Sequence, residues 1–157
     1  MPSRNVSTAA DAATARQARA EPVIFAAALQ RLVASTPGVL GAVLAGVSGN
    51  EVTSTLGRPV PCERLAAMAG TLLAPAGAML EHADVGECRQ VLIESSHGAV
   101  VVMGVGSCHG HGELLLACLT DHSAMLGQVQ WAARRCCNQL RLAAQAFGTG
   151  EPTPSSG

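Results

Sequence analysis

Apolar residues recur at helical spacing in three stretches of the chain. In residues 22–35 the apolar side chains lie three or four positions apart, which places them on one face of a helix. The same spacing occurs in residues 62–82. It occurs again in a stretch that opens near Asp121 or Ser123, either of which suits a helix cap, and runs to Phe147. The pattern therefore predicts three helices.

Between these helices the apolar residues form continuous runs that are bounded by turn residues. Ser48, Gly49 and Asn50 separate the first two runs, as in a β-hairpin. The last three runs follow the second helix in close succession, with short turns between them. The predicted strands cover residues 39–47, 51–57, 87–95, 99–105 and 113–120.

The predicted strands are apolar on both faces. The runs VLGAVLAGV, VVVMGV and LLLACL do not alternate with polar residues, which indicates strands that are covered on both sides. Most connections are too short to contain a crossover helix, so consecutive strands are expected to run antiparallel. The order α-β-β-α-β-β-β-α then predicts an α/β (α+β) fold. Its five-stranded antiparallel sheet lies between helical layers in a three-layer α/β/α sandwich.

The length of 157 residues suits one domain, which we expect to cover residues 21–147. Residues 1–20 contain few large apolar groups and are expected to form a flexible arm, either disordered or a loose helix. Residues 148–157, with the sequence GTGEPTPSSG, are expected to form a disordered tail.

Composition excludes several functions. The chain has no Lys, so it cannot be a P-loop nucleotidase or a pyridoxal phosphate enzyme, each of which needs one. The net charge of −1 gives no support for nucleic-acid binding. No apolar run reaches the roughly 18 residues that suggest a membrane span, and the first residues lack the apolar centre of a secretory signal. Six scattered cysteines without such a signal predict reduced thiols and a cytoplasmic protein.

The stretch SCHGHGE, residues 107–113, resembles part of a metal site. Cys108, His109 and His111 are three possible ligands, but a structural zinc site takes four, usually as two spaced pairs, and no second pair is evident. The alternative is a polar hairpin loop whose glycines adopt positive φ. We expect the loop, with no bound metal, and keep these three residues as weak candidates for a metal site.

Two surfaces are candidates for association. The strand at 87–95 is expected to dimerise through its edge, with Val91 and Ile93, beside Leu72 and Met79 of the second helix. The alternative is an edge covered by a tail. On the last helix, Trp131, Arg134 and Arg135 lie off the main apolar stripe, where Trp and Arg suit a partner surface. The alternative is a Trp that packs on the first helix.

Three stretches together resemble the Roadblock/LC7 family, in its bacterial branch of MglB-like regulators of Ras-like GTPases. They are LQRLVASTPGVLGAVLAGVSGNEV (29–52), RLAAMAGTLLAPAG (64–77) and LLLACLTDHSAMLGQVQWAARRCCNQL (114–140). They resemble the opening helix and hairpin, the middle helix, and the closing strand and helix of a profilin-like sandwich. The CHGHG loop departs from the family pattern, and the family does not rely on a metal there.

The resemblance implies a homodimer that binds or regulates a Ras-like small GTPase through the paired middle helices and sometimes stimulates hydrolysis. We therefore expect a non-enzymatic regulator or adaptor without a cofactor. Arg58 and Arg64, near the start of the middle helix, are candidate partner contacts. Two alternatives remain open: a dimeric scaffold in a signalling or motility complex without a GTPase, and a metal- or thiol-responsive sensor.

Overall fold

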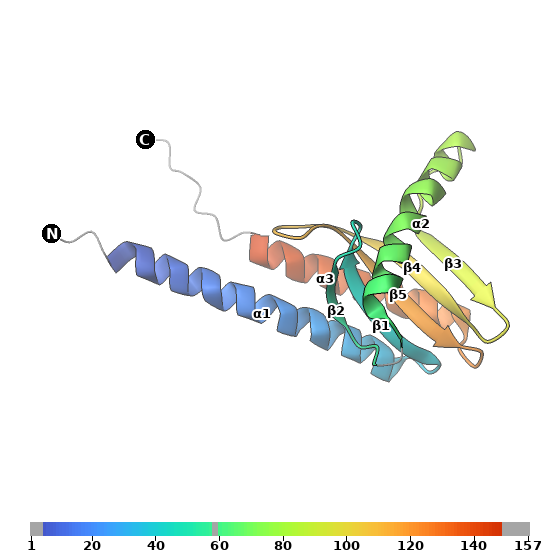
Figure 1. Cartoon of the computed structure of the whole chain (residues 1–157), viewed down its shortest axis with the longest axis horizontal. Helices are drawn as coiled ribbons and strands as arrows, with labels where there is room; N and C mark the ends of the chain where they lie inside the picture. Colours follow the sequence, from blue (N-terminus) through green and yellow to red (C-terminus); the bar gives the residue numbers. More distant parts are fainter. Residues whose placement is uncertain (1–4, 58–59, 149–157) are drawn as a thin grey trace.

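The computed structural model describes residues 5–57 and 60–148 (Figure 1). Within these ranges the helices and strands follow the predicted order. No helix in the described ranges is long and apolar enough to cross a membrane. The elements are α1 (Asn5–Ser35), β1 (Val39–Gly46), β2 (Glu51–Ser54), α2 (Cys62–His82), β3 (Gln90–Ser95), β4 (Gly98–Cys108), β5 (Gly112–Asp121) and α3 (Leu126–Gly148).

The five strands form one antiparallel sheet with the order β2-β1-β5-β4-β3. β5, the last strand in sequence, lies at the centre between β1 and β4. β2 and β3 are the two edges. Each strand pairs with its neighbour in sequence except where the sheet passes from β1 to β5, which brings together segments about 70 residues apart.

Helices cover both faces of the sheet, as the continuous apolar strands predict. Alternate side chains of β1, β4 and β5 point to opposite faces. On one face, residues such as Leu44, Met103 and Leu116 form a buried cluster with α1 and α3. On the other face, Val43, Val102 and Leu115 form a smaller cluster under α2. The predicted three-layer α/β/α sandwich is therefore confirmed, and Figure 1 shows α2 alone on its side.

The first helix is longer than predicted. α1 begins at Asn5, not at residue 22, and it projects beyond the sheet in Figure 1. Pro22 was expected in the first turn but lies inside the helix. The segment before Pro22 is rich in Ala, whose high helix propensity favours continuation of the helix. The arm was expected to be disordered or a loose helix. Its described part, from residue 5, is helical.

Three strand boundaries and the start of the last helix also differ from the prediction. β2 ends at Ser54, three residues early. β3 begins at Gln90, three residues late, whereas β4 continues to Cys108 across a bulge between Gly104 and Gly106. α3 begins at Leu126, so neither Asp121 nor Ser123 caps it. Instead, the Asp121 carboxylate accepts hydrogen bonds from the backbone N–H and the hydroxyl of Ser123, which closes the turn before the helix.

Candidate functional site

α2 has two apolar faces, and the sheet covers only one of them. Ala66 and Ala69 are its buried residues, and Leu73 packs beside them on the α2-side cluster. A helix turns about 100° per residue, so Met68, Leu72 and Met79 share a second stripe, roughly a third of a turn away. Met68 and Met79 are exposed, the latter at 72%. The small side chains on the first face hold α2 close to the sheet, and the larger apolar side chains point elsewhere.

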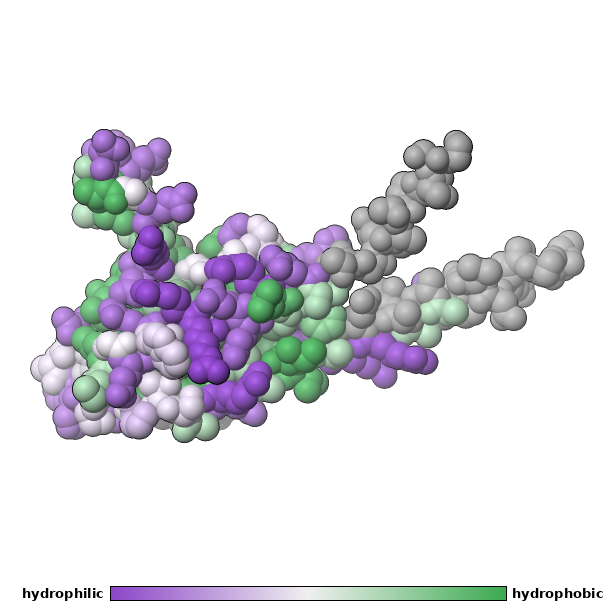
Figure 2. All heavy atoms as spheres, turned by 180° about the vertical axis from the view of Figure 1, so that it is seen from behind, coloured by the Kyte–Doolittle hydropathy of each residue, from purple (hydrophilic) through white to green (hydrophobic). Residues whose placement is uncertain are grey.

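The far half of α2 extends past the body of the protein. No residue after Ala69 in this helix is buried. In Figure 1 the end of α2 stands clear of the sheet, and in Figure 2 this projection carries apolar residues among hydrophilic ones. The exposed methionines of this helix lie outside both buried clusters. Exposed apolar side chains of this kind are typical of surfaces that associate with another molecule.

β3 is an open edge beside α2. It pairs with β4 along one side from Gln90 to Ser95 and has no strand on its other side within the described ranges. Val91 is half-buried against the α2-side cluster, whereas Ile93, on the same face, is 45% exposed. Unpaired N–H and C=O groups beside an exposed apolar side chain favour pairing with another strand. We name Met68, Leu72, Met79 and Ile93 together the α2–β3 surface.

The loop at residues 108–112 is a turn attached to α1. Gly110 and Gly112 have φ values of +85° and +71°, the left-handed conformations expected of the loop glycines. Cys108 is buried, and its thiol donates a hydrogen bond to the Glu21 carboxylate at 3.4 Å. His111 Nε2 lies 3.3 Å from the same Glu21 oxygen. Glu21, a helix residue 87 positions before Cys108, therefore fixes the loop.

The three weak metal candidates do not form a metal site, although Cys108 and His111 both contact Glu21. Cys108 points inward to α1, whereas His109 and His111 are exposed on the loop. Among residues 5–57 and 60–148, no group of three or more His, Cys, Asp or Glu side chains is arranged to hold a metal ion. Burial, followed by the hydrogen bond to Glu21 and the charge of this carboxylate, raises the pKa of Cys108 to about 11. At neutral pH Cys108 is therefore a protonated thiol, which is a poor metal ligand and nucleophile.

We expect Glu21→Gln to increase the alkylation rate of Cys108 several-fold at pH 8. The substitution removes the negative charge and the carboxylate acceptor that stabilise the protonated thiol, so the pKa of Cys108 falls. Iodoacetamide labelling followed by peptide mass spectrometry measures the rate. Glu113→Gln is the matched control, since Glu113 bonds to Ser107 in the same hairpin. Equal acceleration by both variants would indicate loop opening and contradict the charge effect.

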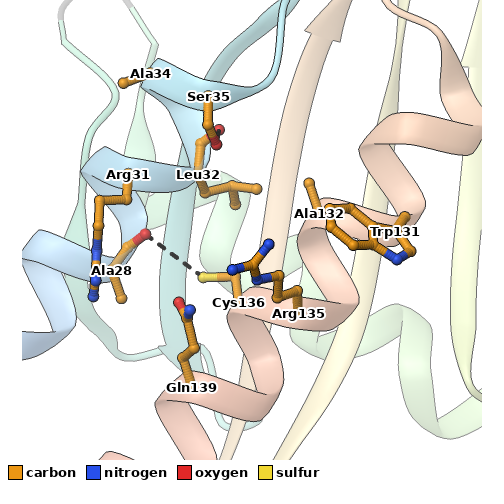
Figure 3. A pocket seen from close by; sticks show the side chains of 10 residues that line it. All are labelled: Ala28, Arg31, Leu32, Ala34, Ser35, Trp131, Ala132, Arg135, Cys136 and Gln139. Carbon is orange, nitrogen blue, oxygen red and sulfur yellow. Dashed lines mark hydrogen bonds between the residues drawn. The ribbon is translucent and has the colours of Figure 1, made fainter.

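A groove between α1 and α3 carries the exposed tryptophan. Its volume is about 440 Å³, and Figure 3 shows Leu32 and Ala132 at its apolar floor. Trp131 is 63% exposed and borders this groove together with residues of α1. The Arg135 guanidinium lies 5.4 Å from the Trp131 ring centroid, in cation–π range. Together with Arg31 on the opposite helix, this arrangement makes the groove apolar at its floor and positively charged at its rim.

The remaining predicted partner residues occupy different places. Arg64 is exposed in the first turn of α2, and Arg134 is exposed on α3. Arg58 lies outside the described residues. Arg64 is therefore on the same helix as the α2–β3 surface, whereas Trp131, Arg134 and Arg135 lie on the opposite face of the sheet. The sequence did not indicate a role for Glu21 or Met68. It also did not show that the residues on α2 and those on α3 lie on opposite faces of the sheet.

The fold defines a class of small α/β/α sandwiches whose five-stranded antiparallel sheet has β3 as an open edge in the described ranges. The Roadblock/LC7 domain model matches residues 25–120. The chain therefore belongs to the Roadblock/LC7 family.

Solved structures agree with this assignment. Myxococcus xanthus MglB is similar with a TM-score of 0.72 and 16% identity, over 84% of this chain and 94% of that chain. A Roadblock/LC7 domain from Streptomyces avermitilis gives a TM-score of 0.67 and 22% identity, over 74% and 94%. Acanthamoeba castellanii profilin IB gives 0.52 and 14%, over 81% and 99%. At these identities the likeness establishes the fold. No curated protein sequence matches the chain.

Proposed function

We propose that this protein is a homodimeric regulator or adaptor that binds a Ras-like small GTPase and has no catalytic site of its own. The α2–β3 surface is the observation that carries the proposal. It combines an open strand edge with an exposed apolar helix stripe, in a chain that belongs to the Roadblock/LC7 family. Two copies related by a two-fold axis would join their sheets through β3 and pair their α2 helices.

The dimer places Arg64 of both copies near one platform. Arg64 lies at the start of α2, about two turns before Leu72 of the apolar stripe that also contains the exposed Met79. The pairing of the α2 helices would form a broad surface with two guanidinium groups. A GTPase surface that carries acidic side chains suits such a platform, because Arg forms bidentate hydrogen bonds with carboxylates. We propose a cytoplasmic location, which the six unpaired cysteines support.

The test is direct binding to small GTPases encoded near the gene for this protein. Each GTPase is loaded with GDP or with a non-hydrolysable GTP analogue and titrated with the purified dimer. We expect binding in the micromolar range or tighter to one nucleotide state. Phosphate release in single turnover then shows whether hydrolysis is stimulated. Absence of binding to either nucleotide state removes the proposal.

Substitutions identify the face that binds. We expect Arg64→Glu to weaken GTPase binding about tenfold, since one charged contact contributes about 1.5 kcal/mol. Arg16→Glu, an equal charge change at an exposed position of α1, is the control. Trp131→Ala should leave this binding within twofold. Loss of binding only in Trp131→Ala would contradict the assignment to the α2 platform.

The α1–α3 groove supports a second candidate function, that of a dimeric scaffold in a signalling or motility complex. It lies on the side of the sheet opposite α2, so it stays accessible when α2 is covered. An exposed Trp stacked by Arg is typical of protein-binding sites. A dimer would carry this groove twice and could hold two further proteins. A pull-down would favour this function if it recovers a partner that is not a GTPase and if Trp131→Ala abolishes the recovery.

A further inference from the structure

The outer surface of α3 has an unbalanced charge. This helix contains Arg134, Arg135 and Arg141 and no Asp or Glu. The acidic residues of the chain lie elsewhere, for example on α2 and in the segment that follows it. Figure 2 shows a band of strongly hydrophilic residues on the side of the molecule opposite α2. The net charge of the chain therefore hides a local excess of positive charge.

Three arginines border one pocket on this surface. Arg89, which directly precedes β3, and Arg134 and Arg141 of α3 line a cavity of about 220 Å³. Asn138 also lines the pocket. Arg134, Asn138 and Arg141 occupy positions i, i+4 and i+7 of α3, so their side chains lie on one face of the helix. The pocket contains no carboxylate. It lies on the α1–α3 side of the sheet, away from the apolar stripe of α2.

Arg141 is held in place before any ligand arrives. Its Nε donates a hydrogen bond of 2.8 Å to the Val105 carbonyl, next to the β4 bulge. Its Nη1 donates a hydrogen bond of 3.1 Å to Asn138 Oδ1. A guanidinium has five N–H donors, so three remain for a ligand. Fixing this side chain in advance reduces the entropy that binding must remove.

No carboxylate lines this pocket, and Glu87, two positions before Arg89, lines a neighbouring cavity instead. The ion pair between His111 and Glu21 does not involve the pocket, since neither residue lines it. Cys137 lies at the inner wall of the pocket, where burial raises its pKa to about 12, so it remains a neutral thiol. Three positive groups thus face a small cavity that no carboxylate lines.

We propose that the pocket formed by Arg89, Arg134 and Arg141 binds a phosphate monoester group. A phosphate monoester carries about −1.5 to −2 charges at pH 7 and three acceptor oxygens, which matches three guanidinium groups better than a single carboxylate does. The cavity is smaller than the roughly 300–1,000 Å³ of ordinary small-molecule pockets, so it suits a phosphate group and not a whole nucleotide. The group comes from a free phosphate compound or from a phosphorylated side chain. This site is independent of the proposed GTPase platform.

The proposal is tested by calorimetric titration of the full chain at low salt, where screening is weak. The probes are inorganic phosphate, a phosphoserine peptide and the same peptide without phosphate. We expect both phosphate probes to bind and the unmodified peptide not to bind. Phosphopeptide affinity at least about tenfold above that of inorganic phosphate identifies a phosphorylated side chain as the source. Equal affinities identify a free phosphate compound.

Variants locate the site. We expect Arg89→Gln and Arg134→Gln each to weaken phosphate binding about tenfold, because each removes a charged hydrogen-bond donor. Arg135→Gln is the matched control and should change binding less than twofold, since Arg135 stacks on Trp131 outside the pocket. In the part of the chain that the structure describes, the side chains of Arg89 and Arg134 make no hydrogen bond to the backbone, so these two substitutions should leave folding unaffected. Lack of saturable binding up to about 10 mM phosphate, or unchanged binding by the Arg89→Gln/Arg134→Gln variant, overturns the proposal.

Discussion

Met79→Glu is expected to convert the proposed dimer into monomers. Met79 is 72% exposed in the isolated chain, so the substitution leaves the fold of each protomer intact. In a two-fold interface it places two carboxylates in an apolar contact, without cationic partners on the α2 stripe. We expect the dimer dissociation constant to rise at least about 100-fold. Analytical ultracentrifugation should give twice the 15.9 kDa chain mass for the wild type and the single mass for the variant.

Leu142→Glu is the matched control for this result. Leu142 is also a large apolar residue, 67% exposed, but it lies on α3. The control should remain a dimer. A wild-type mass of one chain at about 50 µM, or dissociation by Leu142→Glu and not by Met79→Glu, would contradict the α2–β3 surface as the dimer interface.

Gly98→Ala is expected to destabilise the fold by about 3 kcal/mol. Gly98 begins β4 and pairs with Ser95 of β3 and Asp121 of β5. A Cβ at this position would overlap the carbonyl oxygen of Thr120. This oxygen belongs to the backbone of the central strand, so rotation of a side chain cannot relieve the overlap. Urea denaturation followed by circular dichroism measures the loss in the free energy of unfolding.

Gly104→Ala provides the comparison within the same strand. A Cβ added to Gly104 has no heavy atom within 4 Å, so this substitution adds a methyl group without overlap. We expect its effect on stability to stay within about 0.5 kcal/mol. A similar loss in both variants would mean that β4 responds to glycine replacement in general, and that the contact with Thr120 is not the cause.

The layers of the fold were predictable from the sequence because burial on two faces leaves a direct pattern. β1, β4 and β5 have few polar positions, and the structure assigns their alternate residues to the two clusters. Boundaries were less predictable. The predicted start of α3 was wrong because Asp is a common helix cap. In the structure the Asp121 carboxylate instead closes a turn with Ser123. Local side-chain bonds of this kind compete with helix capping and look the same in sequence.

The candidate site was only partly predictable, for a different reason. The exposure of a side chain depends on the packing of distant elements. The spacing in α2 therefore predicted one apolar face, whereas in the structure Ala66 is buried and Met68 is exposed. The contact between Glu21 and Cys108 joins residues 87 positions apart and has no local signal. The arginine pocket likewise needs Arg89 of one segment beside Arg134 and Arg141 of another. Trp131 was predicted as a partner contact from its residue type and its position off the apolar stripe of the last helix, and the structure shows that it is exposed.

The position of β5 at the centre of the sheet determines when the protein can fold during synthesis. β1 and β4 both pair with β5, so neither half of the sheet can join the other before residue 121 has left the ribosome. α2 and β3 are translated earlier, with their apolar residues uncovered. Nascent chains translated from the same mRNA would therefore expose this apolar, aggregation-prone segment before the sheet is complete. A chaperone that shields this segment until translation ends would keep two unfinished copies from associating.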